Sequence, residues 1–114
     1  MEKNYLDYTE FSVYTEIMNF EWDKTKAILN KKKHGVSFEV AITAFDDPFA
    51  LIAPDEKHST ELEIREWLIG ESDSGVLVIV FTKREQGKNY RIISARRANK
   101  KEKMTYEIYK DISI

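Results

Sequence analysis

The chain has 114 residues, a formal net charge of −2 and 42% hydrophobic residues. This composition supplies a core for one compact domain and excludes a disordered chain. No apolar run approaches the roughly 20 residues of a membrane-spanning helix, and the first residues lack a secretory-signal pattern, so the cytoplasm is the expected compartment. The absence of cysteine excludes disulfides, thiol nucleophiles and cysteine-ligated zinc.

The small net charge hides an uneven distribution along the chain. Residues 24–34 contain five lysines and no acidic residue, and residues 88–103 contain seven basic residues against Glu102 alone. Residues 35–73 instead hold ten acidic and two basic residues. If the two basic segments meet in the fold, they form a face that attracts phosphate; otherwise each is an ordinary solvated surface.

The chain divides into an N-terminal extension and one domain. Residues 1–19 are acidic and rich in tyrosine at their start, and residues 11–20 alternate partly, as an edge strand would. No repeat or low-complexity linker interrupts residues 20–114, which we expect to form a single domain.

Two helices are predicted at the start of this domain. Asp23 is a suitable N-cap for the first helix, whose last turn is rich in lysine, and Gly35 ends it. Ser37 is a suitable N-cap for the second helix, in which apolar residues recur at helical spacing. The sequence Asp46-Asp47-Pro48 ends this second helix.

Strand signals follow the helices, over residues 49–54, 61–70, 75–82 and 90–97. Residues 75–82 are apolar almost throughout, which predicts a central strand covered on both faces. The connections at 72–75 and 85–87 are short enough for hairpins, so the last three strands should form an antiparallel meander.

A final helix is predicted from about Lys100 to Lys110. Asn99 can cap this helix, with Glu102 in the position that completes a capping box. The predicted fold class is therefore α+β, with two N-terminal helices, an antiparallel sheet of about four strands and a C-terminal helix.

Strand periodicity brings charged residues together. Glu63 and Arg65 project side by side from the strand over 61–70, and Arg96 comes from the end of the last strand. RNA cleavage needs a base for the 2′-hydroxyl and cations for the charge that develops on the phosphate, and the planar guanidinium matches phosphate oxygens. A cross-strand salt bridge on a solvated face explains the same pattern.

Strict alternation also sorts the charged residues of the last strand. Ser94 and Arg96 share one face, while Arg91 and Arg97 share the opposite one. On this basis the arginines of this strand are divided between the two sides of the sheet.

Histidines offer a second means of proton transfer. His58 lies in a polar loop before the second strand, where it serves as a general acid near neutral pH or is simply exposed. His34 stands at the end of the first helix and forms no metal-ligand spacing with His58, so no metal and no cofactor are predicted. Five aromatic residues are available to stack on unpaired bases or to fill the core: Trp22, Trp67, Tyr90, Tyr106 and Tyr109.

Several short motifs occur in order between about Phe20 and Tyr109. They are Phe20-Glu21-Trp22-Asp23 with Lys26, His34-Gly35-Val36-Ser37-Phe38, Phe45-Asp46-Asp47-Pro48, Arg65 with Ile69-Gly70, and Ile92-Ile93-Ser94-Ala95-Arg96-Arg97-Ala98 with Glu102 and Tyr106. Together they resemble the BrnT family of ribonuclease toxins from bacterial toxin–antitoxin systems. The sequence departs from the family pattern at Ile64, where the family often has an acid, and at Val40, where it often has glutamate.

The resemblance implies a RelE-like toxin fold, an endoribonuclease activity that arrests growth, and a cognate antitoxin of the BrnA-like ribbon-helix-helix class. By matching position, it assigns catalysis to Arg65 and Arg96, with Glu63 behind them. In a metal-independent scheme, Glu63 or His58 takes the 2′-hydroxyl proton. The resemblance leaves four residues as RNA-positioning candidates, namely Lys26, Lys33, Arg91 and Arg97.

A second function is compatible with the same motifs. A catalytically inert relative would bind the antitoxin and help to repress its own operon, with its basic face holding DNA or an acidic antitoxin segment. The arginines at 65 and 96 favour the enzyme, whereas the isoleucine at 64 leaves the binding module open.

Overall fold

The computed structural model describes residues 18–113, so nearly all of the predicted extension over residues 1–19 lies outside the described residues. The elements follow one another in the order β1 (Asn19–Glu21), α2 (Lys24–His34), α3 (Phe38–Ala41), η2 (Ile42–Asp46), β2 (Leu51–Pro54), β3 (Arg65–Ser72), β4 (Gly75–Arg84), β5 (Asn89–Arg97) and α4 (Lys100–Ser113). None of these helices is long and apolar enough to cross a membrane.

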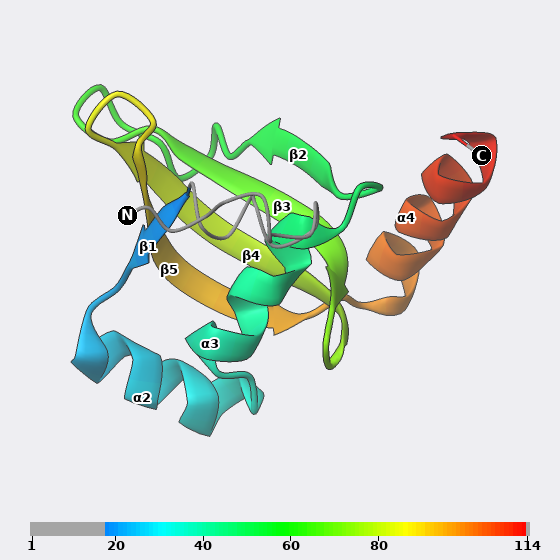
Figure 1. The fold of residues 1–114 in the computed structure, drawn as a ribbon, viewed down its shortest axis with the longest axis horizontal. Coiled ribbons are helices and arrows are strands. Elements are labelled where there is room, and N and C mark those ends of the chain that lie inside the picture. Colours follow the sequence, from blue (N-terminus) through cyan, green and yellow to red (C-terminus); the bar gives the residue numbers. More distant parts are fainter. Residues whose placement is uncertain (1–17, 114) are drawn as a thin grey trace, which may run out of the picture.

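The strands form one sheet in the order β1-β5-β4-β3-β2 (Figure 1). β4 lies at the centre, as its apolar sequence predicts, and β3, β4 and β5 form the predicted antiparallel meander. The predicted cover of β4 on both faces is only partial, because Val76 and Val80 remain partly exposed. β1 pairs in parallel with the edge of β5, with Phe20 opposite Tyr90. The sheet therefore has five strands and is mixed, whereas about four antiparallel strands were predicted. The edge strand predicted within residues 11–20 overlaps β1 at Asn19 and Phe20, and residues 11–17 of that range lie outside the described residues. The parallel pairing of β1 was not predicted, because its partner lies about 70 residues away in the sequence.

Local capping explains where the helices begin and end. The Asp23 carboxylate accepts a hydrogen bond of 3.0 Å from the Lys26 backbone N–H, and Gly35 ends α2 with a φ of 73°. Both predicted signals are confirmed. The predicted second helix also begins after Ser37 but is α-helical only to Ala41, after which the chain continues as the 3₁₀ helix η2.

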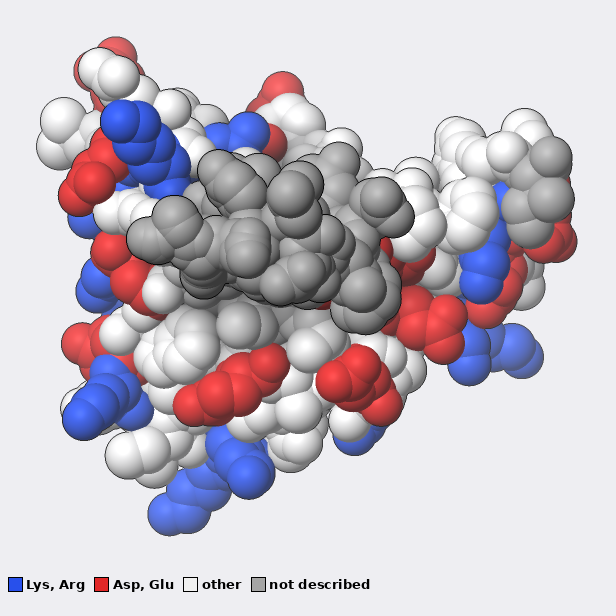
Figure 2. Space-filling view, viewed as in Figure 1, with Lys and Arg blue, Asp and Glu red and all other residues white. Residues whose placement is uncertain are grey.

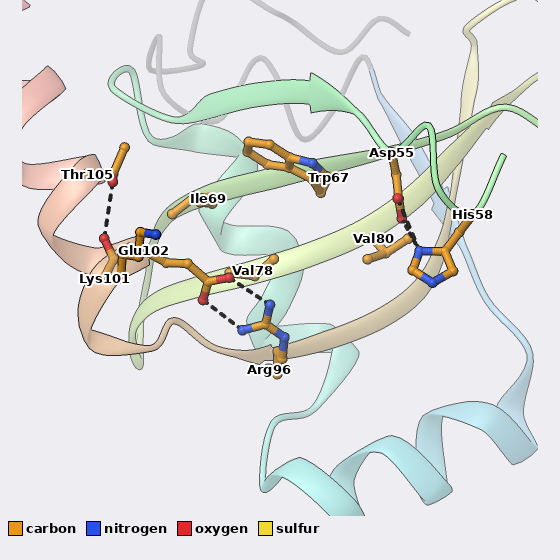
Figure 3. Close-up of a pocket in the computed structure, with 10 residues that line it drawn as sticks. All are labelled: Asp55, His58, Trp67, Ile69, Val78, Val80, Arg96, Lys101, Glu102 and Thr105. Atoms are coloured by element: carbon orange, nitrogen blue, oxygen red, sulfur yellow. Dashed lines mark hydrogen bonds and ion pairs between the residues drawn. The ribbon is translucent and has the colours of Figure 1, made fainter.

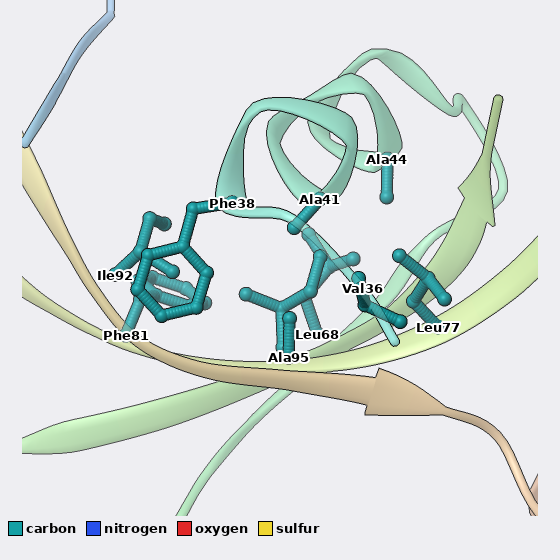
Figure 4. Close-up of a cluster of buried hydrophobic side chains, with 10 residues drawn as sticks. Val36, Phe38, Ala41, Ala44, Leu68, Leu77, Phe81, Ile92 and Ala95 are labelled. Carbon is teal, nitrogen blue, oxygen red and sulfur yellow. The ribbon is translucent and has the colours of Figure 1, made fainter. Parts of the chain in front are cut away.

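The main core lies between the sheet and the helices α3 and η2. Phe38 and Ala41 of α3 are fully buried, as the helical spacing of the apolar residues predicts (Figure 4). Ala44 of η2, which lies outside that spacing, is fully buried as well, whereas Ile42 and Phe45 within it are only partly buried. They pack against buried side chains of three strands, namely Leu68, Leu77, Ile79, Phe81, Ile92 and Ala95. Burial of this apolar surface is the main stabilising contribution to the fold.

The opposite face of the sheet is covered only in part, by the beginning of α4. Tyr106 is fully buried there beside Ile69 and Val78. Its hydroxyl donates a hydrogen bond of 2.5 Å to Asp47, and burial together with this carboxylate raises the pKa of the tyrosine. Beyond Tyr106, α4 projects away from the sheet (Figure 1), so the helices within residues 18–113 leave much of this face, which we call the open face, uncovered.

The predicted strand over residues 61–70 begins four residues later than expected. β3 starts at Arg65, so Glu63 lies in the preceding loop and the predicted placement of Glu63 on a strand is wrong. Leu62, which the predicted strand would place on the same face as Leu68, is instead 98% exposed, whereas Leu68 is buried. The hydroxyl of Thr60 accepts the backbone N–H groups of Leu62 and Glu63, so side-chain bonds replace the strand ladder here.

Candidate active site on the open face

A cavity of about 550 Å³ lies on the open face (Figure 3). Its floor is apolar and consists of Trp67 and Ile69 from β3 and Val78 and Val80 from β4. Arg96 of β5 borders this floor. The loop after β2 closes one end and the first turns of α4 close the other (Figure 3), and these walls contribute polar residues: Asp55, His58, Lys101, Glu102 and Thr105.

Arg96 is held by two hydrogen bonds from α4. Its Nη1 and Nη2 atoms each donate a hydrogen bond of 2.8 Å to the carboxylate of Glu102. The hydrogen bond from Arg96 lowers the pKa of Glu102, and the bond to Glu102 raises the pKa of Arg96. A bidentate pair of this kind fixes the guanidinium plane as well as its position.

The same carboxylate starts the helix. Glu102 accepts the backbone N–H of Asn99 at 2.9 Å, and the Asn99 side chain accepts the backbone N–H of Glu102 at 2.8 Å. The predicted capping box is therefore confirmed. Because one carboxylate serves both purposes, the start of α4 and the guanidinium of Arg96 are fixed relative to each other.

Arg96 keeps one edge available for a ligand. Glu102 occupies the two terminal nitrogens, and within residues 18–113 the Nε atom of Arg96 donates no hydrogen bond. The side chain is 41% exposed. Since guanidinium carries five N–H donors in a fixed plane, the Nε side of Arg96 can receive an anionic oxygen without displacing Glu102.

An irregularity in β5 changes which arginines share the open face. The register between β4 and β5 shifts at Val80 and Phe81, so that Ser94 lies opposite Val80 but Arg91 lies opposite Thr82. Arg91 therefore lies on the same face as Arg96, and its predicted place on the opposite face is wrong. An extra residue in one strand reverses the alternation beyond it, which no strictly periodic reading anticipates.

Arg65 lies on the open face in the same row as Arg91. Both pair with Thr82 of β4, Arg65 from β3 and Arg91 from β5. On β3, Arg65 lies two residues before Trp67 and therefore on the same face. The Nε atom of Arg65 donates to Glu63 at 3.0 Å, and Arg84 donates to the other oxygen of Glu63 at 3.2 Å. The bond from Arg65 is the main reason why the pKa of Glu63 is lowered.

His58 lies with Arg96 on the wall of the cavity, as part of a pair with Asp55. The Nδ1 atom of His58 is 3.0 Å from a carboxylate oxygen of Asp55, and the side chains are 59% and 13% exposed, respectively. Ser59 anchors this loop, because its hydroxyl donates to the Asp55 carbonyl and accepts the Arg65 backbone N–H. The sequence analysis missed Asp55, for which the only signal was its spacing of three residues before His58.

The predicted RNA-positioning residues are divided among three places. Lys26 and Lys33 line a groove of about 220 Å³ with His34 and Ser94, where α2 lies along β5. Figure 2 shows basic side chains gathered over α2, at the lower left of the molecule. Arg91 lies on the open face, whereas Arg97 donates to the carbonyl of Ser74 from a strand position opposite the core residue Leu77.

Asn30 is a further residue that the sequence analysis missed. Its amide donates to the Ala95 carbonyl at 2.8 Å and to the Val36 carbonyl at 3.1 Å, and it accepts the Ala95 backbone N–H at 3.1 Å. Asn30 thus pairs with β5 as a neighbouring strand would, directly before Arg96. Nothing in the spacing of α2 distinguishes this asparagine from an exposed helix residue.

The described residues offer no metal centre: within 18–113, no group of three or more His, Asp or Glu side chains is arranged to hold a metal ion. The polar groups that line the cavity include the guanidinium of Arg96, the imidazole of His58 and the carboxylates of Asp55 and Glu102. Guanidinium groups beside a carboxylate–imidazole pair can bind a phosphate and move a proton at its ester.

Comparison with known families identifies the chain. The family described as the ribonuclease toxin, BrnT, of type II toxin-antitoxin systems matches residues 22–102. The matched residues include the floor of the cavity and Asp55 and His58 from the loop after β2. They also include Arg65, Arg96 and Glu102. A search of curated proteins finds no match. The chain belongs to the BrnT family of ribonuclease toxins of type II toxin–antitoxin systems.

Proposed function

We propose that this toxin is a metal-independent endoribonuclease that cleaves RNA through attack of the substrate's own 2′-hydroxyl on the adjacent phosphate. The observation that carries the proposal is the placement of Arg96 and the Asp55–His58 pair on the walls of one cavity. In this reaction the 2′-oxygen bonds to phosphorus and the bond from phosphorus to the 5′-oxygen breaks. The products are a 2′,3′-cyclic phosphate and a 5′-hydroxyl.

In this proposal Arg96 binds the phosphate at which the reaction occurs. Its Nε side faces a non-bridging oxygen, while Glu102 holds the two terminal nitrogens. A guanidinium held in place before the substrate arrives stabilises the charge of the transition state without reorganising. Arg65 lies two residues before Trp67 on the same face of β3 and holds a neighbouring phosphate.

The base in this proposal is His58 rather than Glu63. The pKa of Glu63 is lowered, and both of its oxygens accept hydrogen bonds from arginines, so it is a weak base. When Nδ1–H of His58 donates to Asp55, Nε2 is the acceptor and can take the proton of the 2′-hydroxyl. The departing 5′-oxygen takes its proton from solvent.

The test uses purified, antitoxin-free protein incubated with RNA in EDTA, with the ends of the products identified. We expect 2′,3′-cyclic phosphate and 5′-hydroxyl ends, undiminished by EDTA. The Arg96→Ala protein, prepared in the same way, reports any contaminating nuclease. Loss of cleavage in EDTA, or 5′-phosphate ends, would contradict the mechanism.

We also propose that expression of the chain alone arrests growth, and that an antitoxin of the ribbon-helix-helix class relieves the arrest by covering the open face. Expression of the parent chain and of Arg96→Ala at matched levels tests the first part. Equal growth of the two strains would favour an inert module that acts only by binding.

A further inference from the structure

The five aromatic residues considered for base stacking occupy different environments. Tyr106 of α4 is fully buried beside Ile69 and Val78 of the sheet, and Tyr90 and Trp22 pack against rings on the helix-covered side of the sheet. Tyr109 is 53% exposed on the part of α4 that projects from the sheet. Of these five, Trp67 is the residue that lines the cavity holding Arg96 and His58.

Polar and apolar groups are separated within this cavity. Trp67 forms part of the apolar floor, with Val80 directly opposite it on β4. The walls carry polar groups, among them Arg96, His58 and Lys101 (Figure 3). A nucleotide has the same division, because its base is a flat, weakly hydrated ring and its phosphate is a fully charged anion.

We propose that the apolar floor is a base-binding subsite, in which one unpaired base of the substrate stacks on the indole of Trp67 while the adjoining phosphate binds Arg96. This inference rests on the proposed function and names its substrate class as single-stranded RNA. Stacking uses the flat face that every base has, so the subsite does not distinguish one base from another.

The shape of the site explains why the base must be unpaired. The floor lies between the loop that carries Asp55 and His58 and the first turns of α4, so a base reaches Trp67 only from between these walls (Figure 3). In a duplex both faces of each base are covered by its neighbours, and side chains read mainly the sugar and phosphate. A base that is splayed out of a single strand has a free face to offer.

The test measures binding of a 2′-O-methyl oligoribonucleotide, which lacks the attacking hydroxyl and cannot be cleaved by the proposed reaction. The variants are Trp67→Phe, which keeps an aromatic ring, and Trp67→Leu, which keeps apolar bulk without one. Trp22→Phe is the matched control, because Trp22 packs against Phe38 on the other side of the sheet. Circular dichroism and urea unfolding establish that each variant is folded.

We expect Trp67→Leu to weaken single-strand binding about 5- to 150-fold, which corresponds to the loss of one base–aromatic stack. Trp67→Phe should retain most of the affinity, and Trp22→Phe all of it. Binding of the same oligonucleotide annealed to its complement should change less than about twofold in every variant, because a paired base does not use the subsite.

The outcomes separate this inference from the proposed function. Unchanged single-strand affinity in folded Trp67→Leu, or an equal loss for single strand and duplex, would overturn the subsite while leaving cleavage by the parent protein unaffected. Conversely, a parent protein that binds through Trp67 but never cleaves RNA would overturn the proposed reaction and retain the subsite. If the leucine variant does not fold, the Trp22→Phe protein tests the stack, because Trp67 is then its one tryptophan. The single strand should quench the fluorescence of Trp67, and an absence of quenching would reject the stack.

Discussion

The arginines of the open face differ in how firmly their partners hold them. Arg96 donates two bonds of 2.8 Å from its two terminal nitrogens to one carboxylate. Within residues 18–113, the side chains of Arg65 and Arg91 each donate one hydrogen bond, of 3.0 Å to Glu63 and 2.9 Å to Glu21, respectively. Two parallel bonds fix a plane and one bond does not, so Arg96 is the best preorganised of the three.

Replacement of Arg96 or Arg65 tests these roles. We expect Arg96→Ala and Arg65→Ala each to slow RNA cleavage roughly a hundred- to thousand-fold, because a preorganised charge at the phosphate is lost. Arg96→Lys should recover little activity, since an ammonium group cannot bind Glu102 and phosphate through separate edges of one plane.

The matched control for these variants is Lys83→Ala. Lys83 is exposed, pairs with Glu66 and follows Thr82 on β4, so its side chain lies on the opposite face of the sheet from Arg65 and Arg91. It should cleave at the parent rate. If both folded alanine variants cleave within about tenfold of the parent rate, a difference of roughly 1.4 kcal/mol, the assignment of the arginines is wrong.

Asn30 makes a testable contribution to stability. Asn30→Leu leaves the N–H and C=O of Ala95 and the carbonyl of Val36 without their partner at a buried position. Each unsatisfied buried group costs about 1–3 kcal/mol, so we expect the free energy of unfolding to fall by at least about 2 kcal/mol in urea titrations. Thr25→Ala, at an exposed position of the same helix, should change it by less than about 0.5 kcal/mol. An Asn30→Leu protein as stable as the parent would show that water replaces the amide at β5.

At the scale of elements, α4 is attached to the rest of the molecule by hydrogen bonds in its first two turns. Its first turn is held by the capping box and by Arg96, and its second turn by the hydrogen bond from Tyr106 to Asp47. Asp47 itself follows η2, so α4 is linked to elements on both sides of the sheet. This double attachment keeps the wall that α4 contributes to the cavity in a fixed position.

The stability that Glu102 contributes should depend on pH. Its pKa in the folded protein lies below the ordinary value of 4.5, because of Arg96 and the Asn99 N–H. A group with a lowered folded pKa stabilises the fold above its unfolded pKa, and this contribution is lost as the pH falls through the folded pKa. We therefore expect Glu102→Gln to be less stable than the parent at pH 7 and the difference to shrink below about pH 4.5.

Urea unfolding of both proteins across this pH range measures the effect. Glutamine keeps an oxygen that can accept the Asn99 N–H, so the comparison isolates the charge interaction with Arg96 from the cap. A difference that stays the same from pH 7 to pH 3 would contradict the linkage.

At the scale of the whole molecule, the helices α3 and η2 cover one face of the sheet, and the helices of the described residues leave much of the other face uncovered. The lysines of α2 reach the edge of β5 from one side, and Arg65, Arg91 and Arg96 lie on the open face beyond that edge. The two basic segments of the sequence therefore meet in part, at β5. The basic residues of 88–103 are themselves divided between the two faces of the sheet, because Arg97 lies on the helix-covered face and Arg91 and Arg96 on the open face.

This arrangement predicts how RNA affinity depends on salt. If about four phosphates bind basic groups around the open face, the logarithm of the association constant should fall with the logarithm of salt concentration with a slope of roughly −3. Fluorescence anisotropy of a 2′-O-methyl oligonucleotide at several salt concentrations measures the slope. Arg91→Ala should reduce its magnitude by roughly 0.7, whereas Lys83→Ala should leave it unchanged. A salt-independent affinity would refute the phosphate contacts.

The sequence by itself determined the features that depend on neighbouring residues. The caps at Asp23, Ser37 and Asn99 and the stop at Gly35 are satisfied by groups within four residues, so the positions of the helices were predictable. The apolar run over 75–82 likewise specified the central strand, and the ordered motifs of the chain specified its family.

Only the tertiary structure decided how the site is assembled. Three features of the site join residues through the sheet register or through packing. They are the bulge that places Arg91 on the open face, the two hydrogen bonds from Arg96 to Glu102, and the cavity that His58 and Arg96 both line. Sequence periodicity describes one element at a time, and it carries no information on where a register shifts or which loop folds over which strand. The chemistry of this cavity therefore depends on contacts that no local pattern specifies.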